Sequence, residues 1–297
     1  MIALDKYFAQ YADDSLLLDT DRWQLALRNG HALSVSAMRE DQFLLLDAET
    51  GMSPAPDRLL PLAESLASLP ASLKFALCPE ASTVRLRAEF PLAEESVAAD
   101  RVRRNLDGMR IAADRLHELV SSKATGVPPA CLCSADSGPA VPGSPTDLIE
   151  EAGWTCHERS GGSLLADLET GGQFCQAELE TFGGGSLRFR VTLCRDAEGE
   201  AVCEALSLYL LKANAARRIA RGFVEHEAGG IAAGFEVLLE GSPVPTEAGH
   251  ALAALSVAAR YCAKEMEVLK DAALAGFYRS AIGDASHLNT KRSSNHG

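Results

Sequence analysis

Hydrophobic and polar positions alternate along two long stretches of the chain, and the elements they predict come in the same order both times. In the first stretch Trp23, Leu25 and Leu27 alternate with polar neighbours. The dipeptide Asn29-Gly30 then supplies the positive φ angles of a tight hairpin turn. This stretch therefore begins with a β-hairpin.

The first stretch continues into a complete α/β unit. Apolar residues at alternating positions predict strands, and apolar residues at spacings of three and four predict amphipathic helices. The predicted elements are a return strand over 33–37, a third strand over 43–46, a short helix over 57–69, a second hairpin with strands at 73–77 and 84–90, and a long helix over 94–120.

After residue 145 the same order is predicted again. A short helix precedes a three-stranded meander, which is followed by a helix, a hairpin and a long helix. The predicted positions are a helix over 148–154, strands at 164–168, 175–179 and 187–193, a helix over 200–212, strands at 219–225 and 231–239, and a helix over 246–269.

This repetition decides the expected architecture, because self-similarity over a long period indicates duplicated units. The expected fold class is α+β, with two tandem α-βββ-α-ββ-α units, each an antiparallel sheet covered by helices. The units could dock as an intramolecular pseudo-dimer. We expect a first unit over 1–120, a Pro/Gly/Ser-rich linker over 121–145, a second unit over 146–283 and a flexible tail over 284–297.

Composition and charge narrow the classes of partner. The chain has 297 residues, 47% of them hydrophobic, which is enough for a sizeable core. Its 28 Lys and Arg against 41 Asp and Glu give a net charge of −13, which repels phosphate backbones and anionic lipid surfaces. Neither a signal peptide nor a membrane span is predicted. We expect an acidic bacterial protein of the cytoplasm that binds neither nucleic acid nor membrane.

The residue types that carry chemistry form no known constellation. The eight cysteines include no CxxC pair, so free thiols are expected. Gly183-Gly184-Gly185 joins two predicted strands and does not lead into a helix, which favours a hairpin turn over a phosphate loop. The seven histidines have no spacing typical of a metal site. The sequence therefore predicts no catalytic residue, no cofactor and no metal.

One apolar stripe near the start of the chain is a candidate for partner binding. Leu4, Tyr7, Phe8 and Tyr11 are spaced as one face of a short amphipathic helix. A helix with three aromatic side chains must cover an apolar surface. The stripe either packs on its own sheet or leaves a groove that a partner fills.

The element order resembles the type III secretion chaperone-like fold, shared by the Tir chaperone family and YbjN-like bacterial proteins. The most specific match is the passage from the last strand into the last helix of each unit. It reads VRLRAEFPLAEES in the first and GFEVLLEGSPVPTEAGHALAAL in the second. Such chaperones are usually single-copy chains that pair as homodimers, whereas this chain supplies both halves. The resemblance implies protein binding and carries over no catalytic residue.

Two functional hypotheses follow. The first is a non-enzymatic protein-binding module, either a monomeric pseudo-dimer or a homodimer, that holds a partner polypeptide at a sheet edge or in a groove. The alternative is an enzyme or small-ligand-binding protein with its site in the cleft between the repeats. The alternative requires polar groups from both halves to converge, such as His31 or His117 with His157 or His226.

Overall fold

A computed structural model gives the three-dimensional structure of the chain. The residues that it describes are 15–19, 22–27, 30–40, 43–66, 69, 72–78, 83–91, 95–121, 144–159, 163–172, 174–182, 185–240 and 243–281. The predicted linker and tail lie outside the described residues, apart from residues 121, 144 and 145 at the edges of the linker.

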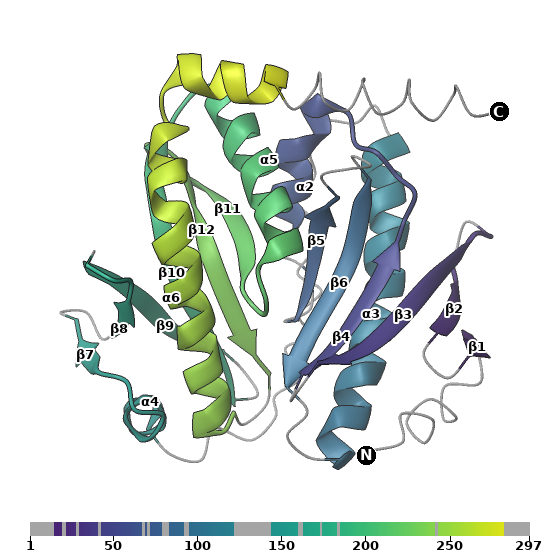
Figure 1. Ribbon diagram of the computed structural model, residues 1–297, viewed down its shortest axis with the longest axis horizontal. Coiled ribbons are helices and arrows are strands. Elements are labelled where there is room, and N and C mark those ends of the chain that lie inside the picture. Colours follow the sequence, from purple (N-terminus) through teal and green to yellow (C-terminus); the bar gives the residue numbers. More distant parts are fainter. Residues whose placement is uncertain are drawn as a thin grey trace.

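The first unit is built on a six-stranded antiparallel sheet with the strand order β1-β2-β3-β4-β6-β5 (Figure 1). Within the described residues, two helices and one turn of 3-10 helix accompany it. The elements are β1 (Ser15–Asp19), β2 (Arg22–Ala26), β3 (Ala32–Glu40), β4 (Phe43–Glu49), η1 (Pro56–Arg58), α2 (Leu59–Ser65), β5 (Leu73–Leu77), β6 (Val84–Pro91) and α3 (Glu95–Ser121).

The second unit has its own six-stranded antiparallel sheet, in the order β7-β8-β9-β10-β12-β11. Its last labelled helix is followed by a further helical stretch over residues 272–281. The elements are α4 (Pro145–Glu151), β7 (Cys156–Glu158), β8 (Leu164–Glu169), β9 (Phe174–Phe182), β10 (Ser186–Ala197), α5 (Glu200–Ala216), β11 (Arg221–Glu227), β12 (Gly230–Leu239) and α6 (Pro245–Val268).

The two sheets have the same topology. Each strand of the first sheet has a counterpart six strands later in the chain, and both sheets exchange the order of their last two strands. This confirms the predicted fold class of two tandem sheet-plus-helix units. The structure adds an outer strand to each sheet, β1 and β7, that the sequence pattern did not predict.

Alternation along the strands puts apolar side chains against one long helix in each unit. On β3, Leu33, Val35 and Ala37 are buried, whereas Ser34 and Ser36 are exposed. α3 covers the first sheet and α6 covers the second. The buried stripes are Val102, Leu106, Met109, Ala113 and Leu116 on α3, and Leu252, Leu255, Ala259, Cys262 and Met266 on α6. Each large apolar side chain buried in this way contributes about 1.5–3 kcal/mol.

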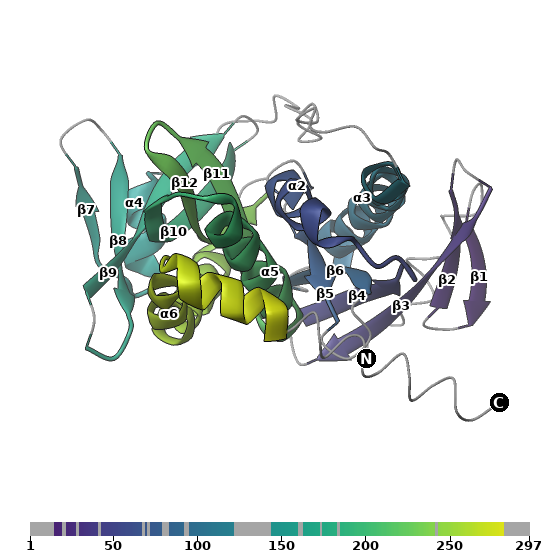
Figure 2. The ribbon, with the colours of Figure 1, turned by 90° about the horizontal axis from the view of Figure 1, so that it is seen from above.

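The units dock through the shorter helices, α2 and α5, and through the edge strands β5 and β11. Seen from above, α2 and α5 lie next to each other between the two sheets (Figure 2). The buried apolar side chains of both units belong to one continuous cluster. All five residues of β5 are buried, because the second unit covers the face that its own helices leave open. Docking as an intramolecular pseudo-dimer is therefore part of this fold.

The described helices include none that combines the length and the apolar character needed to cross a membrane. The exposed face of the long helix α6 carries charged residues such as Arg260 and Lys264.

Core packing can be tested with two phenylalanines of the same sheet. Phe235 on β12 is 0% exposed and Phe174 on β9 is 81% exposed. We expect Phe235→Ala to lower the free energy of unfolding by about 3–5 kcal/mol, because it leaves a cavity. Phe174→Ala should change it by less than about 0.5 kcal/mol. Urea unfolding followed by circular dichroism measures both, and equal losses would contradict this description of the core.

Candidate functional site

The junction between the units is the first candidate site, because the cleft hypothesis requires it. A buried cation of the first unit lies there. Nζ of Lys74, on β5, donates to the carbonyl oxygens of Arg217 at 2.5 Å and Ala220 at 3.4 Å. Both carbonyls belong to the connection between α5 and β11. The ammonium group also forms an ion pair with Glu89 at 3.0 Å, so a charge that is 1% exposed is bonded on several sides.

The second unit makes the reciprocal contact with Arg221, on β11. Its Nη1 donates to the carbonyl oxygen of Leu69, in the connection between α2 and β5, at 3.1 Å, and to that of Leu73, the first residue of β5, at 3.3 Å. Its guanidinium pairs with Glu236 at 2.8 Å. Each unit thus sends a cation from its inner edge strand to the helix-to-strand connection of the other. Interfaces related by a two-fold axis have this reciprocal form.

Asn214 of α5 joins the two inner edges directly. Its Nδ2 donates to the carbonyl oxygen of Phe75 on β5 at 2.8 Å, and its Oδ1 accepts the N–H of Gly222 on β11 at 2.7 Å. Asn214 is 0% exposed. Main-chain groups at both inner edges are therefore already bonded within the chain, so these edges offer little to an added strand.

A strained residue lies at the same junction. Ile219 has a φ of 59°, a left-handed conformation that is costly for a β-branched residue. The carboxylate of Glu89 accepts the main-chain N–H of Ile219 at 2.7 Å. This carboxylate of the first unit therefore holds the connection of the second unit in the shape that receives Lys74.

One pocket at the junction is small. A pocket of about 30 Å³ is lined by side chains of both units, including Ser72, Glu89, Arg101 and Glu240. Arg101 is paired with Glu247 at 2.5 Å. A volume of this size is close to that of one water molecule. Sites for drug-sized ligands are about 300–1,000 Å³, so the pocket does not have the size of a substrate site.

The histidines of the cleft hypothesis lie in separate places. His31 faces His117 of its own unit, with ring centroids 6.3 Å apart. His157 contacts Asp167 of its own unit. His226 pairs with Glu64 of the first unit at 2.6 Å, so it joins the units without meeting another histidine. The described residues also include no cluster of three or more His, Cys, Asp or Glu placed to hold a metal.

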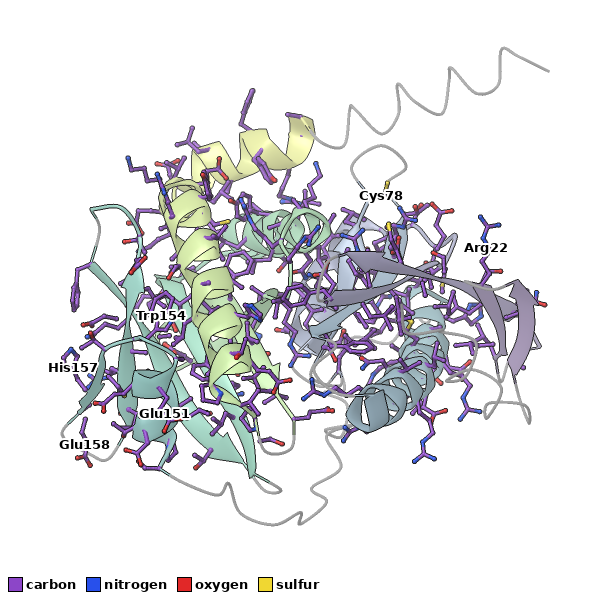
Figure 3. The ribbon with its side chains drawn as sticks, turned by 60° about the horizontal axis from the view of Figure 1, so that its bottom comes forward. Arg22, Cys78, Glu151, Trp154, His157 and Glu158 are labelled. Carbon is purple, nitrogen blue, oxygen red and sulfur yellow. The ribbon has the colours of Figure 1, made fainter. Side chains whose placement is uncertain are left out.

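The outer edges of the two sheets, β1 and β7, are the second candidate. In the described part of the chain no strand pairs with the outer side of either one. Of the two, β7 has described side chains, and His157 and Glu158 on it are exposed. Figure 3 shows His157 and Glu158 at one margin of the molecule, on the opposite side from Arg22 of β2, with Glu151 on the same side but further in.

The register of β7 fixes which main-chain groups point outward. Its N–H and C=O groups alternate in direction, as in any antiparallel pair. The N–H of Asp167 donates to the carbonyl oxygen of Thr155 at 3.1 Å, and the N–H of Arg159 donates to the carbonyl oxygen of Ser163 at 2.8 Å. His157 lies opposite Leu165, midway between these two bonds, so its N–H and C=O face β8. The N–H and C=O of Cys156 and Glu158 therefore point away from the sheet.

Beside this edge, three polar side chains are joined across β7, β8 and β9. His157 Nε2 lies 2.9 Å from Asp167 Oδ2, and Gln176 Nε2 donates to Asp167 Oδ1 at 2.8 Å. The bond from Gln176, and then that from His157, lower the pKa of Asp167. Cys156 lies on the opposite face of the strand, and burial raises the pKa of its thiol. A protonated thiol is a poor nucleophile, so this arrangement lacks the pairing of nucleophile and base.

α4 packs beside β7, near the face that carries Cys156. Ser144 caps the helix by accepting the N–H of Thr146, and Ile149 is 0% exposed. α4 contacts both α6 and β7. The indole of Trp154, in the connection from α4 to β7, packs against the core. Although β7 is only three residues long, it is therefore backed by α4, which is itself packed against α6.

Of the remaining site predictions, some fall on described residues and one falls outside them. The stripe Leu4, Tyr7, Phe8 and Tyr11 lies outside the described residues and stays a prediction. Free thiols are found at the six described cysteines. The sequence pattern missed Lys74 and Arg221 as interface residues, and it missed β7 altogether.

Comparisons with known proteins give no family. No family model matches the chain, and no curated protein matches it. Among solved structures, the di-domain ARO/CYC BexL from the BE-7585A biosynthetic pathway is similar at 12% identity, over 89% of this chain and 94% of that one. The TM-score of 0.15 is too low for this similarity to carry any argument.

Because the contacts across the junction are reciprocal, removing the charge of Lys74 should destabilise the fold strongly. Lys74→Met leaves Glu89 and two carbonyl oxygens without their donor, so the free energy of unfolding should fall by about 3–5 kcal/mol. Replacing both partners, Lys74→Met with Glu89→Met, should cost less than the sum of the two single changes, because neither charge is then left unpaired, although the Ile219 N–H loses its acceptor. Lys264→Met, at an exposed position of α6, is the control. Chemical unfolding measures the two single variants, the double variant and the control, and a Lys74→Met loss no larger than the control's would contradict the role of Lys74.

The charge of Glu236 should stabilise the fold at neutral pH and lose this effect in acid. Burial would raise its pKa, but the guanidinium of Arg221, followed by that of Arg190, lowers it below 4.5. A carboxyl with a lowered folded-state pKa stabilises the fold above its unfolded pKa, and this contribution is lost as pH falls through the folded value.

Unfolding free energies measured from pH 7 down to about pH 3 should therefore show a pH-dependent gap between the wild type and Glu236→Gln. The gap should be largest near neutral pH and shrink below pH 4.5. Glu267→Gln, with a carboxylate 66% exposed, should run parallel to the wild type. A constant gap for Glu236→Gln would refute the contribution of its charge.

Proposed function

We propose that this chain is a non-enzymatic protein-binding module, similar in organisation to type III secretion chaperones, and that it holds an extended partner segment by strand addition at β7. The observation that carries the proposal is the outward direction of the main-chain groups of Cys156 and Glu158. In strand addition, main-chain hydrogen bonds supply affinity and neighbouring side chains supply selectivity.

The arrangement of the sheets supports this choice of edge. Both inner edges, β5 and β11, are bonded to the opposite unit through Lys74, Arg221 and Asn214. Strand addition would therefore take place at the outer edges. Carbonyl groups of β5 and an N–H of β11 are already bonded across the junction within one chain, which favours a monomeric pseudo-dimer over a homodimer. A cytoplasmic location remains part of the proposal.

The alternative, an enzyme or small-ligand protein with its site between the units, has weaker support. The pocket at the junction has about the volume of one water molecule. Among the described residues, no contact joins a candidate histidine of the first unit to one of the second. Turnover of a small molecule by the purified protein would nevertheless reverse the order of the two hypotheses.

Strand addition can be tested by removing one outward N–H. A random peptide display library is the source of ligands, and fluorescence anisotropy measures their affinity. Glu158→Pro deletes an N–H that points outward and leaves the bonds to β8 in place, so binding should weaken by about tenfold, the equivalent of one good hydrogen bond. Glu158→Ala removes the same carboxylate but keeps the N–H. The difference between the two variants isolates the main-chain bond.

A second readout locates the peptide. Hydrogen exchange should slow at the amides of Cys156 and Glu158 when the peptide is bound, because these N–H groups would become donors in a new strand pair. If no library member binds, or if Glu158→Pro binds as well as Glu158→Ala, strand addition at β7 is wrong.

A further inference from the structure

The outer edge of the second unit carries an unbalanced charge that its counterpart in the first unit lacks. From β7 to β9, residues 156–182 contain five Asp and Glu against one basic residue, Arg159. The equivalent strands of the first unit, residues 15–40, contain three of each. The imbalance therefore belongs to one of two topologically equivalent edges and does not follow from the fold.

α4 adds to this charge beside the same edge strand. Glu150 and Glu151 on α4 and Glu158 on β7 are all exposed. Glu150 lies close enough to Cys156 that its charge helps to raise the pKa of the thiol, after the larger effect of burial. No described basic side chain forms an ion pair with these three carboxylates, in contrast to Glu180, which pairs with Arg188. We name Glu150, Glu151 and Glu158 the acidic rim.

The acidic rim adjoins main-chain groups that point away from the sheet. Those of Cys156 and Glu158 fit a polypeptide in extended conformation, because only another strand matches their spacing. The carboxylates restrict the charge of that polypeptide. We propose that the segment taken up at β7 is basic, with Lys or Arg side chains placed along the strand to meet the acidic rim.

This inference rests on the proposed function and adds the chemical class of the partner. A second copy of the chain is a poor occupant, because two acidic rims would face each other across the new strand pair. The same reasoning makes the rim a barrier to self-association. A basic partner segment turns that repulsion into attraction, which raises the association rate and makes it dependent on salt.

The test uses the full chain and three synthetic peptides of equal length, in which valine alternates with lysine, glutamate or glutamine. We expect the lysine peptide to bind at least about tenfold more tightly than the other two at low salt, and to weaken as salt is added. Its binding should slow exchange at the amides of Cys156 and Glu158. A lysine peptide with alternate main-chain nitrogens methylated keeps the charge but loses the hydrogen bonds, and should bind weakly.

A matched pair of triple variants separates the acidic rim from net charge. Glu150→Gln, Glu151→Gln and Glu158→Gln together should weaken the lysine peptide by about tenfold, from three partly screened charge contacts. The control removes three exposed carboxylates elsewhere, through Asp107→Asn, Glu118→Gln and Glu267→Gln. The control should bind the peptide as the wild type does.

The outcomes distinguish this inference from the function on which it rests. If all three peptides protect the β7 amides equally, strand addition stands and the basic preference is wrong. If the methylated peptide binds as well as the unmodified one, general charge attraction explains the binding and the inference fails. If no peptide protects these amides, both fail. If deleting residues 284–297 speeds exchange at β7, the chain's own tail with Lys291 and Arg292 is the occupant, and a separate partner is excluded.

Discussion

The arrangement of the two units depends on the exchange of buried cations at their junction. Lys74 and Arg221 each leave their own sheet edge and donate to carbonyl oxygens that the other unit's helix-to-strand connection presents. Each cation also has a carboxylate on the neighbouring strand. A buried charge is tolerated only when it is paired and hydrogen-bonded. Because the carbonyl acceptors come from the opposite unit, separating the units would leave both cations with incomplete partners.

This dependence explains how a duplicated chain closes two of its four sheet edges. An unpaired edge strand invites another chain to pair with it. Here β5 and β11 do not pair with each other as strands, and instead Asn214 links a carbonyl of one to an N–H of the other. Arg87 adds a bond of 2.7 Å to the carbonyl of Ala215 in the last turn of α5. A cation at a helix C-terminus also interacts favourably with the helix dipole.

Much of the fold could be predicted from the sequence because periodicity reports which face of an element is buried. The strands of the meander and the stripe along α6 follow the simple rule that one face is apolar. Lys74 shows where the rule ends. In the sequence LKFAL it reads as the outward residue of a half-buried strand, yet it is 1% exposed, because the other unit covers that face. Burial by a distant segment leaves no local pattern.

The outer strands were missed for two different reasons. β1 reads SLLLD, where consecutive leucines hide the alternation that identifies a strand. β7 is only three residues long, below the length at which alternation can be recognised. The candidate site at β7 therefore had no sequence signal of its own, apart from the excess of acidic residues around it. That excess becomes informative only once the structure brings α4 next to β7.

The shortness of β7 also constrains how such an edge could bind. Two residues with outward main-chain groups offer few hydrogen bonds, and each contributes about 0.5–1.5 kcal/mol net. An edge of this length is weak as a template for indiscriminate pairing, which suits a protein that must stay unaggregated. The same weakness means that main-chain bonds alone cannot select a partner. Side-chain contacts from α4 and β7 must supply the rest, and the three exposed carboxylates of the acidic rim are placed beside this edge to do so.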